Sequence, residues 1–180
     1  MKSLPTPFIL LLALSSFAHA KTESTDATPK FPKPIVEKIE GWTIELDPAL
    51  KAPDQRKFLQ DVKKAMANHL QRIVYILPPE KTKALRKLPI RIDLEHKLTS
   101  MQYPPARQWL IANGHDPSLE KRVHVPRARS LLARGTWAKH PYVILHELAH
   151  AYHDQVLGFD HPEVLKAYNR SEKEGLYERV

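Results

Sequence analysis

The chain has 180 residues, of which 42% are hydrophobic, and a formal net charge of +8 at pH 7. This length and composition predict one domain with an ordinary packed core. The sequence contains no cysteine, which excludes disulfide bonds, a cysteine nucleophile and a thiolate metal site. The positive charge is not accompanied by interleaved aromatic and basic residues, so we expect no nucleic-acid partner.

The first 20 residues have the pattern of a cleaved secretory signal. Lys2 supplies a positive start, residues 8–14 (FILLLAL) form a short apolar run, and residues 18–20 (AHA) fit a small-x-small cleavage site. The apolar run is shorter than the roughly 20 residues that span a bilayer, so we expect no stable membrane insertion after cleavage. Residues 21–34 have the composition of a disordered, Pro-rich leader. The mature protein is therefore expected to be secreted or periplasmic.

The next part of the chain predicts strands and one long helix. Two short extended segments flank Gly41, and the second, residues 42–46, alternates apolar and polar side chains as a half-buried strand does. A helix is expected over residues 54–77, where apolar residues recur every three or four positions, with Asp54 as its N-cap. His69 stands alone on the apolar face of this helix, which favours a packed core histidine over a metal ligand.

The remaining sequence predicts shorter elements and two further helices. In chain order we expect a short basic helix at 80–87, a strand at 90–95, a loop with a helical turn at 101–117, and an edge strand at 122–125. Pro141 begins a helix that Gly158 ends. A last helix is expected from His161 to about residue 173. These elements predict an α+β fold in which a small sheet packs against the long amphipathic helix.

Residues 146–150 read His-Glu-Leu-Ala-His, inside the helix that begins at Pro141. Because each helical residue turns by about 100°, His150 lies one turn beyond His146 on nearly the same face, and both imidazoles can bind one metal ion. Glu147 lies about 100° away, within reach of a water on the metal without being a ligand. Zn²⁺ takes neutral imidazole nitrogens and keeps a position open for water in catalytic sites. We therefore expect His146 and His150 to bind zinc and Glu147 to be the general base.

The longer H-E-x-x-H-x-x-G-x-x-H pattern is excluded, because His153 and Val156 stand where it requires glycine and histidine. His153 shares the face of the metal ligands but lies two turns from His146. This distance favours a substrate contact or a supporting role over ligation. Asp154 is expected to be a hydrogen-bond acceptor beside the site or a plain helix cap.

The third protein ligand is sought among glutamates after His150. Glu172 lies at a distance that suits a return through a helix–turn–helix, and it is the preferred candidate. Glu163 follows the turn too closely, while Glu174 and Glu178 lie further along the same segment. For each of them taken singly, an exposed helix charge is the simpler interpretation.

The segment His-Glu-Leu-Ala-His-Ala-Tyr-His-Asp-Gln at 146–155 resembles the active-site helix of exported bacterial zincin-like metallopeptidases. It is distantly similar to the anthrax lethal-factor type of catalytic domain. Supporting similarities extend over most of residues 35–180, at positions 41–43, 101–103, 109–114 and 157–160. The resemblance implies a zincin-like fold, with zinc bound by His146 and His150 and with Glu147 as catalytic base.

Relatives of this type take their third ligand from a glutamate on a helix well past the second histidine, within an aromatic and acidic segment. The sequence contains no such segment, so the domain at 35–180 is also expected to be an incomplete, truncated relative. The leading hypothesis is an exported zinc-dependent metallopeptidase that hydrolyses peptide bonds in peptides, proteins or peptidoglycan cross-links. The alternatives are a catalytically inactive or truncated zincin-like binding protein and, below both, a metal buffer built from the 10 histidines.

Overall fold

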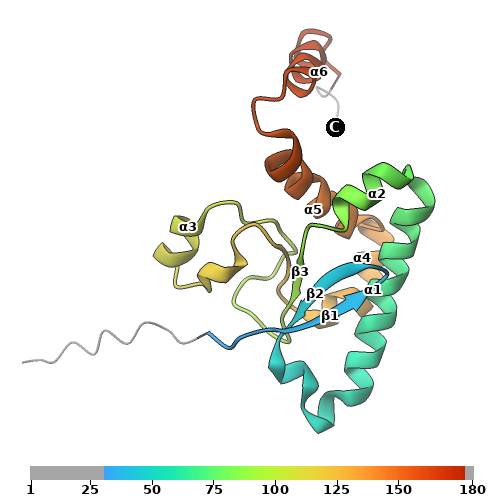
Figure 1. The fold of residues 1–180 in the computed structure, drawn as a ribbon, viewed down its shortest axis with the longest axis vertical. Helices are drawn as coiled ribbons and strands as arrows, with labels where there is room; N and C mark the ends of the chain where they lie inside the picture. The colour runs from blue at the N-terminus through green and yellow to red at the C-terminus, as the bar shows by residue number, and fades with distance from the viewer. Residues whose placement is uncertain (1–30, 177–180) are drawn as a thin grey trace, which may run out of the picture.

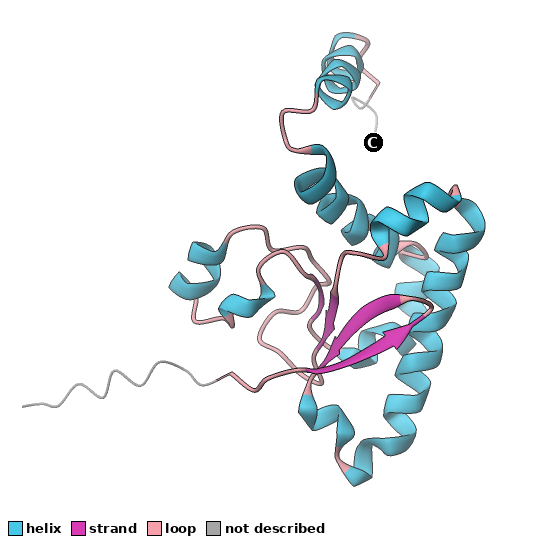
Figure 2. Cartoon of the chain, in the orientation of Figure 1, coloured by secondary structure: helices cyan, strands magenta, loops and turns pink. Residues whose placement is uncertain are grey.

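The computed structural model describes residues 31–176. The expected signal peptide, residues 21–30 of the expected leader and Glu178 lie outside the described residues. The described chain folds into a small four-stranded sheet surrounded by helices, which confirms the α+β class (Figures 1 and 2).

The sheet has the strand order β1-β2-β3-β4. Strands β1 (Ile35–Ile39) and β2 (Trp42–Leu46) form an antiparallel hairpin, while β3 (Ile90–Ile92) and β4 (Val123–Val125) add to it in parallel. The hairpin turns at Gly41, whose φ is +86° and where a Cβ atom would lie only 2.8 Å from Nε of Arg86. Glycine is therefore required there both by the backbone conformation and by the close approach of Arg86.

The two short parallel strands, β3 and β4, are more buried than the sequence predicts. The alternation over 90–95 predicts a half-exposed strand, but β3 ends at Ile92 and all three of its residues are buried, as are those of β4. Parallel strands are commonly covered on both faces, so their polar side chains are enclosed too. Arg91 and His124 consequently lie inside the fold.

Helix α1 (Arg56–Ile76) confirms the long helix expected over 54–77. Its apolar face contributes Leu59, Val62, Met66, Leu70 and Ile73 to the core that also buries Trp42 and Ile44 of β2. The expected N-cap is wrong. Asp54 lies in a short 3-10 turn, and Gln55 precedes the helix without a side-chain capping bond.

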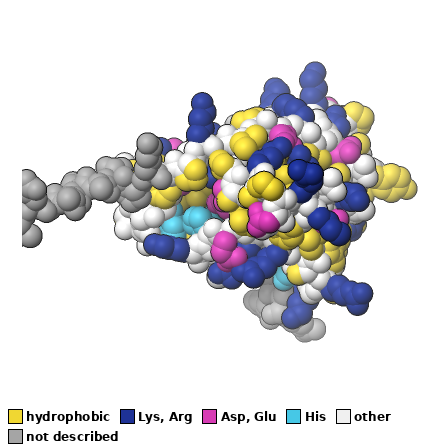
Figure 3. All heavy atoms as spheres, turned by 90° about the horizontal axis from the view of Figure 1, so that it is seen from below, with side chains coloured by type: hydrophobic (Ala, Val, Ile, Leu, Met, Phe, Trp, Pro, Cys, Tyr) yellow, Lys and Arg dark blue, Asp and Glu magenta, His cyan; other side chains and the backbone are white. Residues whose placement is uncertain are grey.

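The other helices follow in chain order: α2 (Pro79–Leu85), α3 (Arg107–Ala112), α4 (Arg134–Lys139), α5 (Val143–Tyr152) and α6 (Pro162–Lys173). Helix α5 packs against α1, α2 and β4, whereas α6 extends beyond the rest of the fold (Figure 1). Within residues 31–176, every helix is too short or too polar to span a bilayer. On the face drawn in Figure 3, Lys and Arg side chains are interspersed with acidic and apolar ones.

The expectation that His69 is a core histidine is confirmed. The side chain is buried, and its ring stacks on Trp137 with centroids 4.0 Å apart and an interplanar angle of 13°. Burial, and secondarily the charge of Arg72, lower the pKa of His69 from 6.5 to about 4. The ring is therefore neutral in the folded protein at neutral pH.

This burial predicts a pH-dependent stability. Because the pKa of His69 is lower in the folded than in the unfolded chain, the unfolded chain binds the proton first as pH falls, and stability is lost between pH 6.5 and about 4. We expect His69→Phe, which preserves the stacking, to reduce the slope of unfolding free energy against pH in this range. Urea unfolding at several pH values measures the slope. The control is His140→Gln, at an exposed position. A slope for His69→Phe that equals the slope for this control would contradict the lowered pKa of His69.

Candidate functional site

Helix α5 brings His146 and His150 together as their spacing predicts. Their Nε2 atoms lie 3.2 Å apart, and the ring planes meet at 84°. Two nitrogen ligands of one tetrahedral zinc ion, each at 2.0–2.1 Å, are separated by about 3.3 Å. Desolvation and the neighbouring His146 lower the pKa of His150, which favours the neutral imidazole that metals bind. The pair therefore fits a shared transition-metal ion.

Glu147 lies one residue on, buried, and borders a cavity of about 610 Å³. Burial raises the pKa of its carboxyl group, against smaller opposing effects of His146 and of a hydrogen bond from the backbone N–H of Tyr103. The cavity is lined by Thr99, Ser100, Met101, Ser130, Thr136, by residues 140–143, and by His146 and Glu147. A carboxylate with a raised pKa beside an open cavity has the properties of a general base near neutral pH.

The loop that contains Gln102 and Tyr103 is fixed to the rest of the fold at two points. Gln102 and His124 exchange two backbone hydrogen bonds, of 3.1 and 2.8 Å, which place the loop along β4. The Tyr103 hydroxyl donates to Asp154 at 2.5 Å and accepts from the side-chain amide of Gln155 at 3.1 Å. Burial, followed by the bond to Asp154, raises the pKa of the Tyr103 hydroxyl. Asp154 thus acts as a hydrogen-bond acceptor that joins this loop to the end of the motif helix.

His153 does not join the two motif histidines. The α-helix changes at this residue into a π-helical turn, His153–Leu157, which ends at Gly158 with φ of +84°. The His153 ring packs edge-to-face on Phe159 at a centroid distance of 5.3 Å. It borders an apolar groove of about 440 Å³ on the other flank of α5, together with Leu145, Ala149 and Tyr152. The structure thus separates His153 from the two motif histidines, and its expected contact with substrate or support of the site stays a prediction.

Glu172 lies exposed on α6, where it accepts a hydrogen bond of 2.6 Å from the hydroxyl of Tyr168. Glu174 pairs with Arg170 at 2.9 Å on the same helix. Both carboxylates have partners one helical turn away. Within residues 31–176, no group of three converging His, Asp or Glu side chains contains His146 and His150. The structure therefore does not bring Glu172 to the motif histidines.

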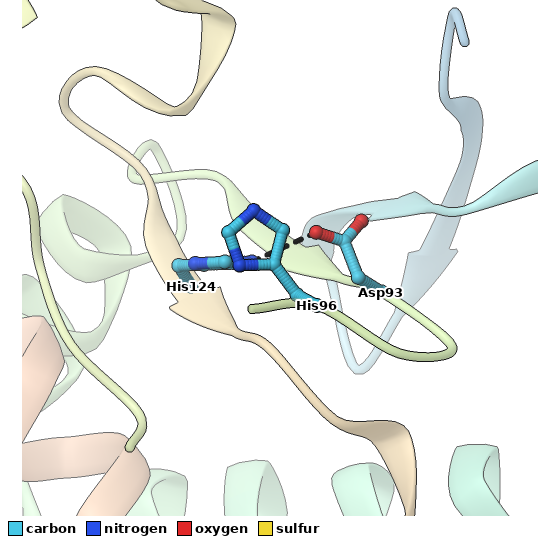
Figure 4. A group of neighbouring side chains, drawn as sticks. All are labelled: Asp93, His96 and His124. Carbon is cyan, nitrogen blue, oxygen red and sulfur yellow. Dashed lines mark hydrogen bonds and ion pairs between the residues drawn. The ribbon is translucent and has the colours of Figure 1, made fainter. Parts of the chain in front are cut away.

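Residues 31–176 contain one group of three converging metal-binding side chains, which the sequence analysis did not predict. The group consists of Asp93, His96 and His124 (Figure 4). Their candidate ligand atoms all lie within 4.8 Å of one another, so the group could hold a metal ion. Its members come from the end of β3, the following loop and β4. The one sequence signal is the Asp-x-x-His spacing at 93–96, while the contribution of His124 depends on the parallel pairing of the strands.

No protein-family model, no curated protein and no solved structure matches the chain.

Proposed function

We propose that the protein is a zinc-dependent hydrolase of peptide bonds, an exported metallopeptidase with a zincin-like active site. The single observation that supports this most strongly is the convergence of the His146 and His150 Nε2 atoms, 3.2 Å apart, beside the buried carboxyl group of Glu147. Zinc held by the two imidazoles would supply a Lewis acid that polarises a carbonyl group and activates water.

The residues of the chain have distinct roles in this proposal. The Glu147 carboxylate faces the cavity, takes a proton from the attacking water and returns it to the leaving amine. The backbone N–H of Tyr103 lowers the pKa of that carboxyl group, against the larger effect of burial. The cavity of about 610 Å³ is large enough for a few residues of a peptide or protein substrate. Its lining of hydroxyl, imidazole and apolar side chains carries no Lys or Arg, which favours a substrate without an acidic group at this point.

The separation of Glu172 from the two histidines favours a second candidate, a zincin-like binding protein without catalytic activity. Two imidazoles without a third protein ligand hold zinc less tightly than a three-ligand catalytic site. Glu172→Gln tests whether this residue completes the site. A third ligand supplied by Glu172 predicts weaker zinc binding in this variant than in Glu163→Gln, whereas equal zinc binding by both variants excludes Glu172 from the site.

The proposed activity is tested on the zinc-loaded protein with a mixture of unlabelled peptides, analysed by mass spectrometry. We expect cleavage that disappears when 1,10-phenanthroline removes the metal and returns when zinc is added back. Bonds cleaved equally with and without chelator would contradict the proposal, as would intact peptides in the presence of folded, zinc-loaded protein. The second candidate, the binding protein, predicts the latter outcome.

A further inference from the structure

We infer that Asp93, His96 and His124 form a second metal site, selective for a divalent transition-metal ion such as zinc and independent of the His146–His150 pair. Two imidazoles and one carboxylate are ligands that suit zinc and its neighbours better than magnesium or calcium, which prefer oxygen alone. Only the paired strands bring the three residues together, since they lie up to 31 positions apart in the sequence.

The geometry of the group fits a common ion. Nε2 of His124 lies 2.8 Å from Oδ2 of Asp93, and the His96 ring meets the His124 ring at 90° with centroids 4.9 Å apart. The candidate ligand atoms of all three residues fall within 4.8 Å of one another. Ligand atoms at 2.0–2.2 Å from one ion are separated by about 3 Å, so binding would draw the three side chains closer together. Figure 4 shows the His96 ring beside His124 and the Asp93 carboxylate directed at the same point.

Outer hydrogen bonds hold the Asp93 and His96 side chains as they hold ligands in metal sites. Nε of Arg91 donates to Oδ1 of Asp93 at 2.6 Å, which leaves Oδ2 for the site. The N–H of Leu98 donates to Nδ1 of His96 at 3.0 Å and orients that ring.

An ion at this position would join the loop after β3 to the sheet. Asp93 directly follows β3 and His124 lies in β4, whereas His96 is half-buried in the loop. Glu95 in the same loop already pairs with Arg127 at 2.8 Å. The loop continues through residues 99–101, which border the cavity beside Glu147, to Gln102, which pairs with His124 of β4. The second ion would therefore have a structural role, as a clamp on one wall of that cavity.

The test uses a full-length chain in which the motif pair is removed by His146→Ala and His150→Ala. Zinc alone is the probe, and zinc content is measured after equilibrium dialysis, with folding checked by circular dichroism. We expect one zinc per chain. A further His96→Ala substitution should weaken binding by more than about 100-fold, since loss of an outer partner alone costs about 10–100-fold. The matched control His161→Ala, on the turn before α6, should retain the ion.

A second measurement does not depend on the stability of the His96 variant. Lys97 is exposed in the loop, so trypsin should cleave after it more slowly when zinc is added to the double variant. A folded double variant that retains no zinc, or one that keeps its zinc after His96→Ala, would overturn the second site. Failure of the proposed zinc site at His146 and His150 would instead appear as equal zinc content in the wild type and the double variant.

Discussion

Replacing Glu147 with Gln is expected to lower peptide hydrolysis by about 10²–10⁴-fold, the usual contribution of a positioned general base. Gln keeps the size of the side chain and an oxygen that accepts the Tyr103 N–H, but it cannot take a proton from water. The variant should remain folded, because a neutral side chain is favoured at a buried position where the pKa of the carboxyl group is already raised.

The measurement compares kcat/KM and zinc content of Glu147→Gln with those of Glu163→Gln, an exposed position on α6. We expect Glu147→Gln to keep its full zinc content and lose activity. We expect Glu163→Gln to keep both at the wild-type values. Residual activity within a few-fold of the wild type would show that Glu147 is not the base. No activity in the wild type would favour the non-catalytic binding protein.

Truncating Leu148 to Ala is expected to destabilise the fold by about 2–5 kcal/mol. Leu148 lies about 200° round α5 from His146, on the side of the helix that faces the core, and it is fully buried there. Removing it leaves a cavity behind the helix that carries the metal ligands. Urea unfolding measures the loss. Leu165→Ala, at a side chain that is 43% exposed on α6, is the control and should change stability by about 0.5 kcal/mol or less. Equal losses would contradict the orientation of α5.

The local parts of the fold could be predicted from the sequence because they depend on short-range patterns. The apolar periodicity of α1, the alternation in β2, and the glycines at 41 and 158 each determine a local conformation. Short-range patterns could not predict the residue at which β3 ends or the burial of Arg91. They depend on which strands become neighbours, and the parallel pairing of β3 with β4 is a long-range property.

The same distinction between local and long-range structure applies to the candidate site. His146, Glu147 and His150 lie within one helix, so the helical repeat alone predicts that the two imidazoles converge. A ligand supplied from elsewhere in the chain cannot be predicted by that repeat. Glu172 lies at a suitable distance along the sequence, but α6 extends beyond the rest of the fold and its carboxylate bonds to Tyr168 instead. Sequence spacing also could not predict the group of Asp93, His96 and His124. These residues come together only because the strands that carry them pair in the folded chain.

The most direct test of the proposed zinc site is the number of zinc ions bound per chain in the wild type and in the His146→Ala, His150→Ala double variant. Both proteins are dialysed against the same free zinc concentration and checked for folding. The wild type is predicted to hold one zinc more than the double variant, whether or not the second site is occupied. Equal zinc content in two folded proteins would contradict the claim that the motif on α5 is a metal centre.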